Sequence, residues 1–537
     1  MRLPNQAAID ANNLLHVSLL HTDITKAAFV PALAEALPAV QLVGDSLTRL
    51  TYSLRPAATW DDGQPVLAQD ILFTLKLMFC PGLPNEAARN QYRFIRNILP
   101  DPANARRFVV ECRGQAPEYV QASGDFFILP EHVLDPRGWL RRLSLAQLRN
   151  PPPGPAPDTA LQAVAQRYRA ETALGHLPGC GPYQLVKWEK DHYLSFRRKA
   201  HWWADLLRPA PLVLQARPRR LTYAVIPNAA SATLALQRGE LDLYPQMPAP
   251  EFARLQASPT ARKKLTFHST PSYDVVVAGF NTRHSTLADA PTRRALGQLF
   301  DAAGLLRATQ LGSGQRTVGI ISPSDSANYN DTLTPLPFSP EGGAALLRQA
   351  GWQQSNVPEP GWFRRGPNGA RERLRLVLRY RAEEALFATI ALQFQSVAAK
   401  LGIPVVLQPT EAGAFTMALH GGDFDMYVRT LRGNPFMFNF VPILHSLGVG
   451  EDNTTGFSTP GSDHLIEAIA AAGTKTRRAQ LLRQFQALLQ REMPLVPLFF
   501  LPNRVVVSRR LRGVYVGSIK PGYSVAAASP LASQPPN

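Results

Sequence analysis

Apolar and polar residues alternate between Thr48 and Leu54. Leu50, Tyr52 and Leu54 fall on one face of this segment, which predicts a strand with one buried side. Nearer the N-terminus, apolar residues at helical spacing instead predict a helix that covers Leu14, Leu15, Val17, Leu19 and Leu20.

A second helix is expected after Pro65. Asp70 falls in its first turn, where the helix dipole favours a carboxylate. The apolar face of this helix comprises Ile71, Leu72, Leu75 and Met78. Core packing explains such a stripe without any catalytic role.

The second half of the chain shows a strand, helix, strand rhythm. Residues 374–380 read as a strand, a helix is expected over 386–401, and Val405 to Leu407 read as the next strand. This order implies a parallel sheet with a buried helix face. A last amphipathic helix through 481–489 precedes two strand-like segments, 496–500 and 505–508.

Several residues mark where elements begin and end. Ser339 is an expected N-cap followed by Pro340, and Gly351 is the expected terminator of the same helix. Gly239 likewise reads as the residue just after a helix. Segment 150–158 is rich in proline and predicts a stiff surface connector, and segment 524–537 is expected to be frayed.

Composition indicates a folded chain with more than one core. The chain has 537 residues, and single cores stop growing at about 250–300 residues. Hydrophobic residues make up 45% and charged residues 18%, which is typical of globular proteins. The net charge of +17 is scattered without a long basic run, which favours a solvated surface over nucleic-acid binding. Proximity to anionic lipid headgroups or collection of anionic ligands stays open.

Sequence patterns give little support to catalysis or metal binding. The chain lacks a nucleophile elbow, a phosphate-loop lysine motif, a zinc-protease helix and a dinucleotide fingerprint. Glu240 and Asp242 stand at a helix-to-strand junction without further catalytic partners, and the histidine pair His192 and His201 favours a surface role. We therefore expect neither an enzyme nor a cofactor or metal site.

The cysteines and the N-terminus leave the cellular compartment undecided. The three cysteines, Cys80, Cys112 and Cys180, allow at most one disulfide. The first twenty residues lack the features of a secretory signal, and no run has the roughly 18 apolar residues of a membrane helix.

Five segments, in order along the chain, resemble segments of one protein family. The segment from Trp60 to Ile71 resembles the pattern W-x-D-G-x-P-V-x-A-x-D-V/I. The others are 179–203, with Cys180 in place of a usual threonine, 235–243, 275–301 and 339–352. The family is the large solute-binding proteins that feed peptide-type ABC importers. Within the fourth segment, Arg294 resembles the family's arginine and is expected to anchor its helix or nearby loops.

The resemblance implies an α/β fold of the two-lobed periplasmic-binding-protein type, class II, with an extra subdomain inserted in the first lobe. The expected lobe 1 is discontinuous, and the predicted parts are lobe 1 over 1–47, 172–266 and 498–537, the inserted subdomain over 48–171, and lobe 2 over 267–497. Two such lobes are expected to hold a solute in the cleft between them.

The resemblance also suggests site residues, most of which follow the Asp423-Phe424-Asp425 sequence. Peptide-binding members commonly have an acidic residue there that faces the ligand's ammonium group. This chain has Leu431-Arg432-Gly433-Asn434-Pro435 instead, and Arg429 adds a second cation nearby. An anionic, blocked or larger oligopeptide-like ligand, or a non-peptide, is therefore expected. The candidate ligand-binding residues are Arg432, Arg429, Tyr427, Asn434, Tyr183 and Asn281.

The resemblance further implies partners and a place in the cell. The expected partners are a peptide or peptide-like solute and ABC transporter permease subunits, with no nucleic acid, and the protein is expected to be a monomer. A periplasmic or other extracytoplasmic location is expected, either free or with a lipid anchor, and the start of the sequence is expected to be truncated. The alternative is a ligand-sensing or scaffold protein that uses the same fold without transport.

Overall fold

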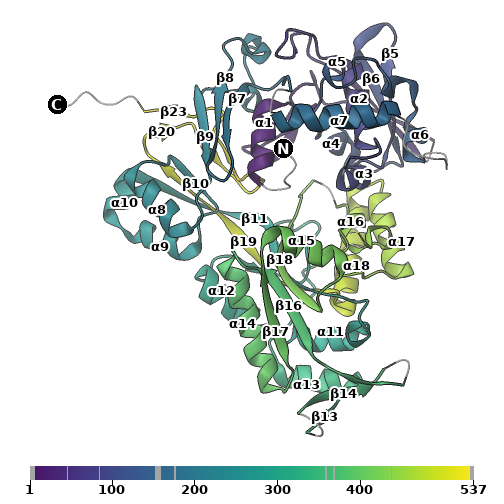
Figure 1. Cartoon of the computed structure of the whole chain (residues 1–537), viewed down its shortest axis with the longest axis vertical. Helices are drawn as coiled ribbons and strands as arrows, with labels where there is room; N and C mark the ends of the chain where they lie inside the picture. The colour runs from purple at the N-terminus through teal and green to yellow at the C-terminus, as the bar shows by residue number, and fades with distance from the viewer. Residues whose placement is uncertain are drawn as a thin grey trace. The chain divides into compact units, whose positions relative to one another are not determined.

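The chain forms two compact units, each described here by itself (Figure 1). The computed structural model describes residues 6–44, 46–83, 85–150, 159–174, 177–356, 360–366, 369–436, 438–450 and 452–531. Unit 1 comprises Met1–Met247, Arg254–His268 and Val505–Asn537, and unit 2 comprises Pro248–Ala253 and Ser269–Arg504. The separate subdomain over 48–171 and the exact lobe bounds stay predictions.

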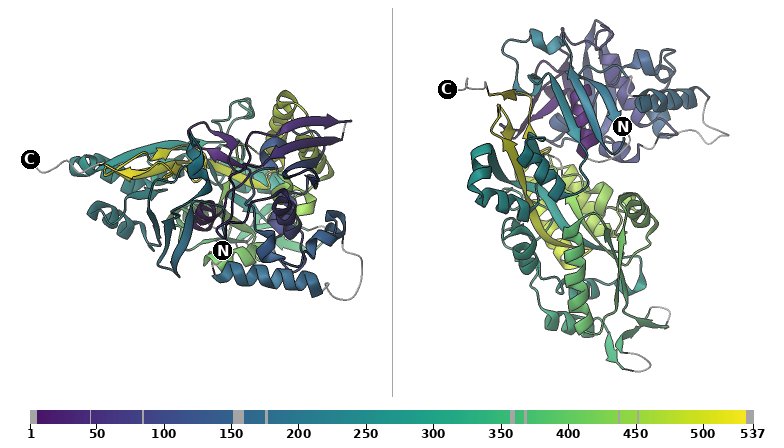
Figure 2. Two further views of the ribbon diagram at one scale, coloured as in Figure 1. Left: turned by 90° about the horizontal axis from the view of Figure 1, so that it is seen from above. Right: turned by 60° about the vertical axis from the view of Figure 1, so that its left-hand side comes forward.

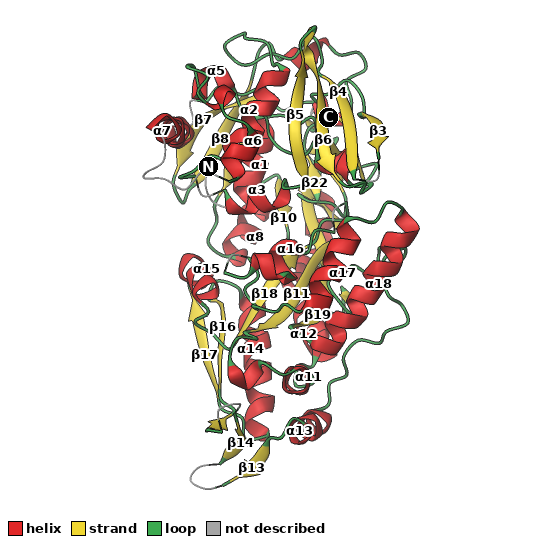
Figure 3. Ribbon diagram, turned by 90° about the vertical axis from the view of Figure 1, so that its right-hand side faces the viewer, coloured by secondary structure: helices red, strands yellow, loops and turns green. Residues whose placement is uncertain are grey.

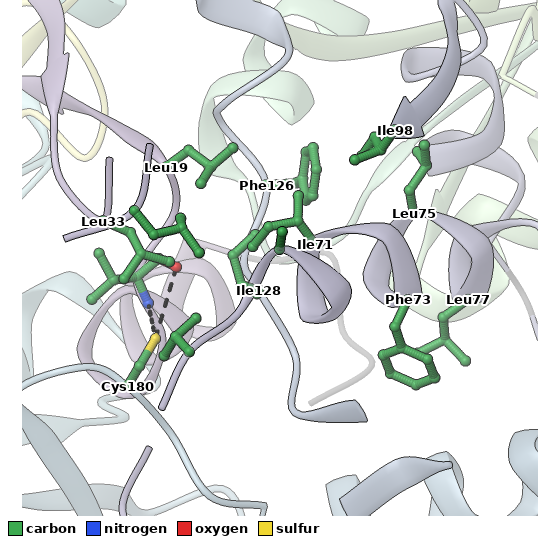
Figure 4. Packing of buried hydrophobic residues seen from close by; sticks show 14 of the residues in the cluster. Leu19, Leu33, Ile71, Phe73, Leu75, Leu77, Ile98, Phe126, Ile128 and Cys180 are labelled. Atoms are coloured by element: carbon green, nitrogen blue, oxygen red, sulfur yellow. Dashed lines mark hydrogen bonds between the residues drawn. The ribbon is translucent and has the colours of Figure 1, made fainter. Parts of the chain in front are cut away.

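Unit 1 contains an antiparallel sheet of four strands in the order β3-β4-β6-β5. These strands are β3 (Ala39–Val43), β4 (Leu47–Ser53), β6 (Asn104–Arg113) and β5 (Ile95–Asp101). Leu50 and Tyr52 of β4 are buried, whereas their neighbours along the strand are partly exposed, so the predicted alternation is confirmed. Helix α2 (Ala68–Met78) packs on β5 and β6, and Figure 4 shows Leu75 of α2 beside Ile98 of β5.

Asp70 holds the start of α2 through both carboxylate oxygens. Its Oδ2 accepts the backbone N–H of Leu67 at 2.9 Å, and its Oδ1 accepts the N–H of Glu131 at 3.0 Å. The side chain is buried, and burial raises the pKa of Asp70 despite these two hydrogen bonds. The residue predicted to complement the helix dipole therefore also ties α2 to the segment that begins α5 (Glu131–Leu134).

The predicted helix through Leu20 is wrong beyond Leu15. Helix α1 spans Gln6–Leu15, and Leu20 already begins strand β1 (Leu20–Asp23), which pairs with β2 (Ala28–Pro31). The carbonyl oxygen of Leu15 accepts the N–H of Gly181 at 2.9 Å, so it is not used to extend the helix. A Cβ at Gly179 would lie 2.0 Å from the same oxygen, so this approach requires glycine.

Unit 1 also holds a three-stranded antiparallel sheet and two short strand pairs. The sheet comprises β7 (Tyr183–Glu189), β8 (Tyr193–Arg198) and β9 (Arg220–Ala224). The short pairs are β20 (Leu511–Arg512) with β23 (Ser529–Pro530), and β21 (Tyr515–Val516) with β22 (Tyr523–Ser524). The expected fraying is thus wrong for 524–531, whereas 532–537 lie outside the described residues, as do 151–158 of the predicted connector.

The remaining helices of unit 1 surround these sheets. They are α3 (Glu86–Gln91), α4 (Tyr119–Ala122), α6 (Leu145–Arg149), α7 (Thr159–Leu174), α8 (Ala229–Arg238) and α10 (Pro259–Lys264), with the short 3-10 helices η1 (Leu140–Arg142), η2 (Trp203–Leu206) and η3 (Leu212–Leu214). Helix α9 (Ala249–Ala257) contains the boundary between the two units. Gly239 follows α8 with a positive φ of 79°, which confirms its predicted role as terminator.

A seven-stranded sheet lies mostly within unit 2 (Figure 3). Its path runs β10-β19-β11-β18-β16-β17, and β12 pairs with β19. The strands are β10 (Leu243–Pro245), β19 (Leu495–Ser508), β11 (Leu265–Phe280), β18 (Met426–Arg432), β16 (Leu376–Arg381), β17 (Val405–Thr410) and β12 (Gln315–Arg316). Strand β19 is continuous, although the pattern predicted two segments, and the boundary between the units falls within β19 and β11.

The predicted strand, helix, strand unit is confirmed. Strands β16 and β17 are parallel, with Leu376 opposite Val405, and α14 (Ala385–Lys400) connects them. Phe387, Ile390 and Phe394 of α14 are buried against the sheet. In the right-hand view of Figure 2, α14 is the long green helix of unit 2.

Helices cover both faces of the unit 2 sheet, since alternate residues of β11 enter two different cores. The helices are α11 (Ala290–Gly297), α12 (Ala302–Gln310), α13 (Pro340–Gln349), α15 (Ala412–Gly421), α16 (Val441–Leu444), α17 (Pro460–Ala470) and α18 (Lys475–Glu492), with η4 (Ser285–Leu287) and η5 (Ser446–Gly448). A small sheet comprises β13 (Gln353–Ser355), β14 (Gly361–Arg365) and β15 (Arg371–Arg373). Ser339 caps α13 as predicted, since its Oγ accepts the N–H of Gly342 at 3.0 Å.

The predicted arginine anchor of α11 is Arg293 rather than Arg294. The buried guanidinium of Arg293 donates to the carbonyl oxygens of Leu287 and Ala288, at 2.8 and 2.6 Å. It also donates through Nε to the oxygen of Met493, at 3.1 Å. Burial lowers the pKa of Arg293 to about 10. The sequence pattern could not decide between two adjacent arginines, because either one satisfies it.

Among the described residues, no helix combines the length and the apolar composition needed to cross a membrane. The three cysteines are all buried and unbridged. Burial raises the pKa of Cys80 and Cys180 to about 11 each, so both thiols stay protonated at neutral pH.

Candidate functional site

Most of the predicted site residues lie on or next to β18. Met426, Tyr427 and Val428 are buried, Arg429 is half-buried, and Arg432 at the end of the strand is exposed. Strand β18 runs antiparallel to β11 and parallel to β16. It therefore carries the chain from the interior of unit 2 to the surface.

Tyr427 lies flat across a glycine of the neighbouring strand. It is paired with Gly279 of β11, where a Cβ would lie 2.1 Å from the tyrosine ring. The phenol oxygen accepts a hydrogen bond from the hydroxyl of Thr454 at 3.1 Å, and Phe424 packs edge-on at 5.4 Å between ring centroids. Three contacts thus fix the position of a ring that is 1% exposed.

Arg429 lies over this ring. It is two residues beyond Tyr427 on the same face of β18, and its guanidinium carbon lies 5.2 Å from the ring centroid. The Nε atom of Arg429 is buried and has no hydrogen-bond partner among the described residues. The guanidinium is therefore held in place by stacking, and its buried Nε donor is unused.

Arg432 and Asn434 lie at the exposed end of the strand. Arg432 faces Asp274 across the β11–β18 pair. The Asn434 side-chain oxygen accepts the N–H of Phe436 at 2.9 Å and so stabilises the turn that follows. Between them, the N–H of Gly433 donates to the oxygen of Tyr273 at 2.8 Å.

Asn281 has a structural position inside unit 2. It is 1% exposed, and its amide donates to the carbonyl oxygens of Gly422 and Phe424, at 3.1 and 3.2 Å. These bonds hold the loop that leads into β18. Asn281 thus supports Tyr427 indirectly, through the Phe424 that packs on its ring.

A histidine that the sequence reading missed completes this loop. His284 Nδ1 lies 2.7 Å from Asp425 Oδ1, and Asp425 Oδ2 accepts the N–H of Val377 at 2.7 Å. The sequence signal was the acidic pair Asp423 and Asp425, whose second member needs a partner when it is half-buried. The spacing of 141 residues to His284 hid that partner.

Tyr183 belongs to unit 1. It is 2% exposed, and its hydroxyl donates to the carbonyl oxygen of Pro218 at 2.9 Å. Burial raises the pKa of Tyr183, so the phenol stays protonated. Next to it, the indole N–H groups of Trp202 and Trp203 both donate to the oxygen of Cys180, at 2.9 and 2.8 Å. These contacts give the Gly179–Gly181 turn a packing role.

The geometry of unit 2 thus brings Tyr427 and Arg429 together as a stacked pair, with Asn281 behind them and Arg432 and Asn434 farther along the chain. The guanidinium of Arg429, positioned by the tyrosine ring, can present N–H donors to a carbonyl or carboxylate group. In the described part of the chain, no group of three or more His, Cys, Asp or Glu side chains is arranged to hold a metal ion.

Known proteins resemble this chain in sequence and in structure. The family model described as bacterial extracellular solute-binding proteins, family 5 Middle, matches residues 28–447. Heme-binding protein A of Haemophilus influenzae is 23% identical, in a match that covers 65% of this chain and 59% of that protein. Oligopeptide-binding protein OppA of Bacillus subtilis is 20% identical, with 86% of this chain and 79% of that protein covered.

The fold is also shared with solved structures. The oligopeptide-binding protein AppA of Bacillus subtilis, in complex with a nonapeptide, superposes with a TM-score of 0.77. The identity is 19%, and the match covers 98% of this chain and 95% of that one. These findings confirm the expected α/β fold of periplasmic solute-binding proteins. Because the family model matches well over half of the sequence, the chain belongs to the bacterial extracellular solute-binding proteins of family 5.

Proposed function

We propose that this protein is the solute-binding component of a peptide-type ABC importer, which captures an oligopeptide-like solute outside the cytoplasmic membrane and delivers it to the permease subunits. The family match over residues 28–447 carries this proposal. Oligopeptide binding is named for relatives that match most of this chain in sequence or in fold. Solute capture without turnover agrees with the family, which comprises binding proteins.

Arg429 is proposed to contact the solute, and the buried ring of Tyr427 is proposed to hold its guanidinium in position. Tyr427 is immobilised by Gly279 and Thr454, and Arg429 is stacked on it with a buried Nε that lacks a partner among the described residues. A guanidinium positioned in advance loses little side-chain entropy when it binds a carboxylate or carbonyl oxygen. Arg432 and Asn434, at the exposed end of β18, are proposed as further solute contacts, although Arg432 belongs to the opposite face of the strand from Arg429.

The solute is proposed to be anionic, N-blocked or longer than a short free peptide. Segment 431–435 supplies one cation and no carboxylate. Asp274 of β11 is the acidic residue paired with Arg432 of β18. A free ammonium group at this place would meet arginine charge, which costs binding energy.

Substitution of Arg429 tests this site. The protein is unfolded and refolded to remove carried-over solute, and binding of acidic, N-acetylated and basic oligopeptides is measured by calorimetry. Arg429→Gln is expected to weaken binding of the preferred peptide by about tenfold or more, since a charged hydrogen bond contributes about 1.5–3 kcal/mol.

The matched control is Arg375→Gln, an exposed arginine just before β16 of the same sheet. It is expected to keep full affinity. Equal affinity of the wild type and Arg429→Gln for every peptide that binds would contradict the proposed site. Tight binding of peptides only when their N-terminus is free and cationic would contradict the proposed solute class.

Transport and location are tested in cells. Deletion of the gene is expected to abolish uptake of the bound peptide, and fractionation is expected to find the protein outside the cytoplasmic membrane, either free or lipid-anchored. A monomer is expected by light scattering. Normal uptake in the deletion strain, with peptide binding intact in vitro, would favour a sensing or scaffold function instead.

A further inference from the structure

Exposed cations gather in unit 1 where the ends of α8, α10 and β19 meet. In Figure 1 these helices lie beside the C-terminal strands β20 and β23. We call this group the basic cluster, and its members, all exposed, are Arg238, Arg262, Lys263, Lys264, Arg509, Arg510 and Arg512. The cluster is distinct from the proposed solute site, whose arginines belong to unit 2.

Hydrogen bonds join the three segments of the basic cluster. The N–H of Arg509 donates to the oxygen of Lys264 at 2.8 Å, and its Nε donates to the oxygen of Arg262 at 3.0 Å. Arg510 reaches the end of α8, where its Nη2 donates to the oxygen of Gly239 at 2.6 Å. The segments that carry the cations therefore lie side by side, so the charges are close together although they are far apart in the sequence.

Acidic side chains compensate little of this charge. Among the described residues, Arg510 is the member of the basic cluster that forms an ion pair, with Asp242 at 2.9 Å. Glu240 is the other acid in the same turn. The carbonyl ends of α8 and α10 offset part of the charge, as helix dipoles do, but seven cations against two carboxylates leave a positive surface.

Exposed aliphatic side chains flank the cluster. Leu531 is 51% exposed, and its N–H donates to the oxygen of Arg510 at 2.7 Å. Leu234 is 45% exposed and lies one helical turn before Arg238 on α8. Cations bordered by exposed aliphatic groups match the headgroup and upper acyl regions of a bilayer.

We propose that the basic cluster docks the protein on anionic phospholipid headgroups. Phosphate oxygens would accept hydrogen bonds from Arg262, Lys263 and Lys264, while Leu234 and Leu531 contact the adjacent apolar layer. A membrane is favoured over a protein partner because the cluster lacks the aromatic anchors typical of protein interfaces. Such docking would confine a carrier to the surface at which it delivers its solute.

Vesicle co-sedimentation tests the proposal. The full-length protein is mixed with phosphatidylcholine vesicles, with or without phosphatidylglycerol, at low and at high salt. Binding is expected with phosphatidylglycerol, and it is expected to weaken at high salt because screening shortens the range of the attraction. The triple variant Arg262→Gln, Lys263→Gln, Lys264→Gln is expected to lose at least about tenfold in partitioning, since each basic residue near the surface contributes about 1 kcal/mol.

The control variant Lys400→Gln, Lys475→Gln, Arg477→Gln removes the same charge from exposed positions of unit 2. It is expected to bind vesicles like the wild type. Equal losses in the two triple variants would overturn the proposal. Failure of the wild type to bind phosphatidylglycerol vesicles would also overturn it. Solute binding and melting temperature are measured on the same variants. A loss of solute binding or of folding is thereby distinguished from a loss of vesicle binding.

Discussion

At the scale of single residues, the contact of Gly279 with Tyr427 sets the geometry of the proposed site. The tyrosine ring occupies the space where any other residue would place its Cβ. Sequence could not reveal this, because the two residues belong to strands that are far apart in the chain. The sequence did single out Tyr427 and Arg429, but their stacking depends on the absent side chain at position 279.

Gly279→Ala is therefore expected to displace the Tyr427 ring. The new Cβ would lie 2.1 Å from a ring carbon, and overpacking of a core costs about 1–3 kcal/mol. Chemical denaturation measures this loss, and calorimetry measures the accompanying loss of solute affinity. Gly421→Ala is the control, since nothing lies within 4 Å of its Cβ position. Equal stability of the two variants would contradict the described packing.

His16 predicts how stability depends on pH. Burial, assisted by the charge of Lys199, lowers its pKa from 6.5 to about 4, and its Nδ1 has no partner among the described residues. The unfolded chain therefore binds the proton more tightly than the folded one. Stability from this residue is present above pH 6.5 and is lost as the pH falls from 6.5 towards 4.

The expected loss over this range is at most about 3 kcal/mol, at 1.36 kcal/mol for each unit of pKa. Urea denaturation of the wild type and His16→Gln, at a series of pH values, measures it. The variant is expected to show a flatter profile between pH 6.5 and 4. His192→Gln, at an exposed turn residue, is expected to keep the wild-type slope. Identical slopes for His16→Gln and the wild type would rule out this role.

At the scale of elements, sequence pattern predicted those helices and strands whose signals are local. The strand from Thr48, the helix 386–401 and the cap at Ser339 all depend on neighbours within a few residues, and the structure has them. The prediction for the end of the first helix was wrong, because that end is set by the turn at Gly179 to Gly181, more than 160 residues away. The prediction of a frayed C-terminal segment was wrong for 524–531, because strands of two residues show too little periodicity to be recognised in a sequence.

Asp70 gives a prediction at this scale. Asp70→Asn keeps the size of the side chain but places an amide N–H group against a backbone N–H donor. The expected loss of stability is about 1–3 kcal/mol, the usual cost of a buried donor that lacks its acceptor. Asp191→Asn, in a turn with a φ of 63°, is expected to be neutral because asparagine tolerates this conformation. Thermal unfolding compares the two, and an unchanged Asp70→Asn protein would contradict the capping role.

At the scale of the whole molecule, the resemblance of five ordered segments predicted the family and its fold, and both are confirmed by the match over 28–447 and by the shared architecture. The site was harder to predict. The segment that follows Asp425 is found from sequence, but burial divides its residues into support, such as Tyr427, and exposed groups, such as Arg432. The burial of each residue cannot be read directly from the sequence, and the solute that binds depends on which residues are exposed.

Solute binding by the refolded, solute-free protein tests the central claim most directly. Thermal shift is measured against acidic, N-blocked, neutral and basic oligopeptides, with sugars as controls. We expect a saturable rise with acidic or N-blocked peptides, which corresponds to about 2.7 kcal/mol at a hundredfold excess over Kd. The absence of a shift with every peptide class, from a protein that refolds cooperatively, would contradict the proposal that this chain is a peptide-type solute carrier.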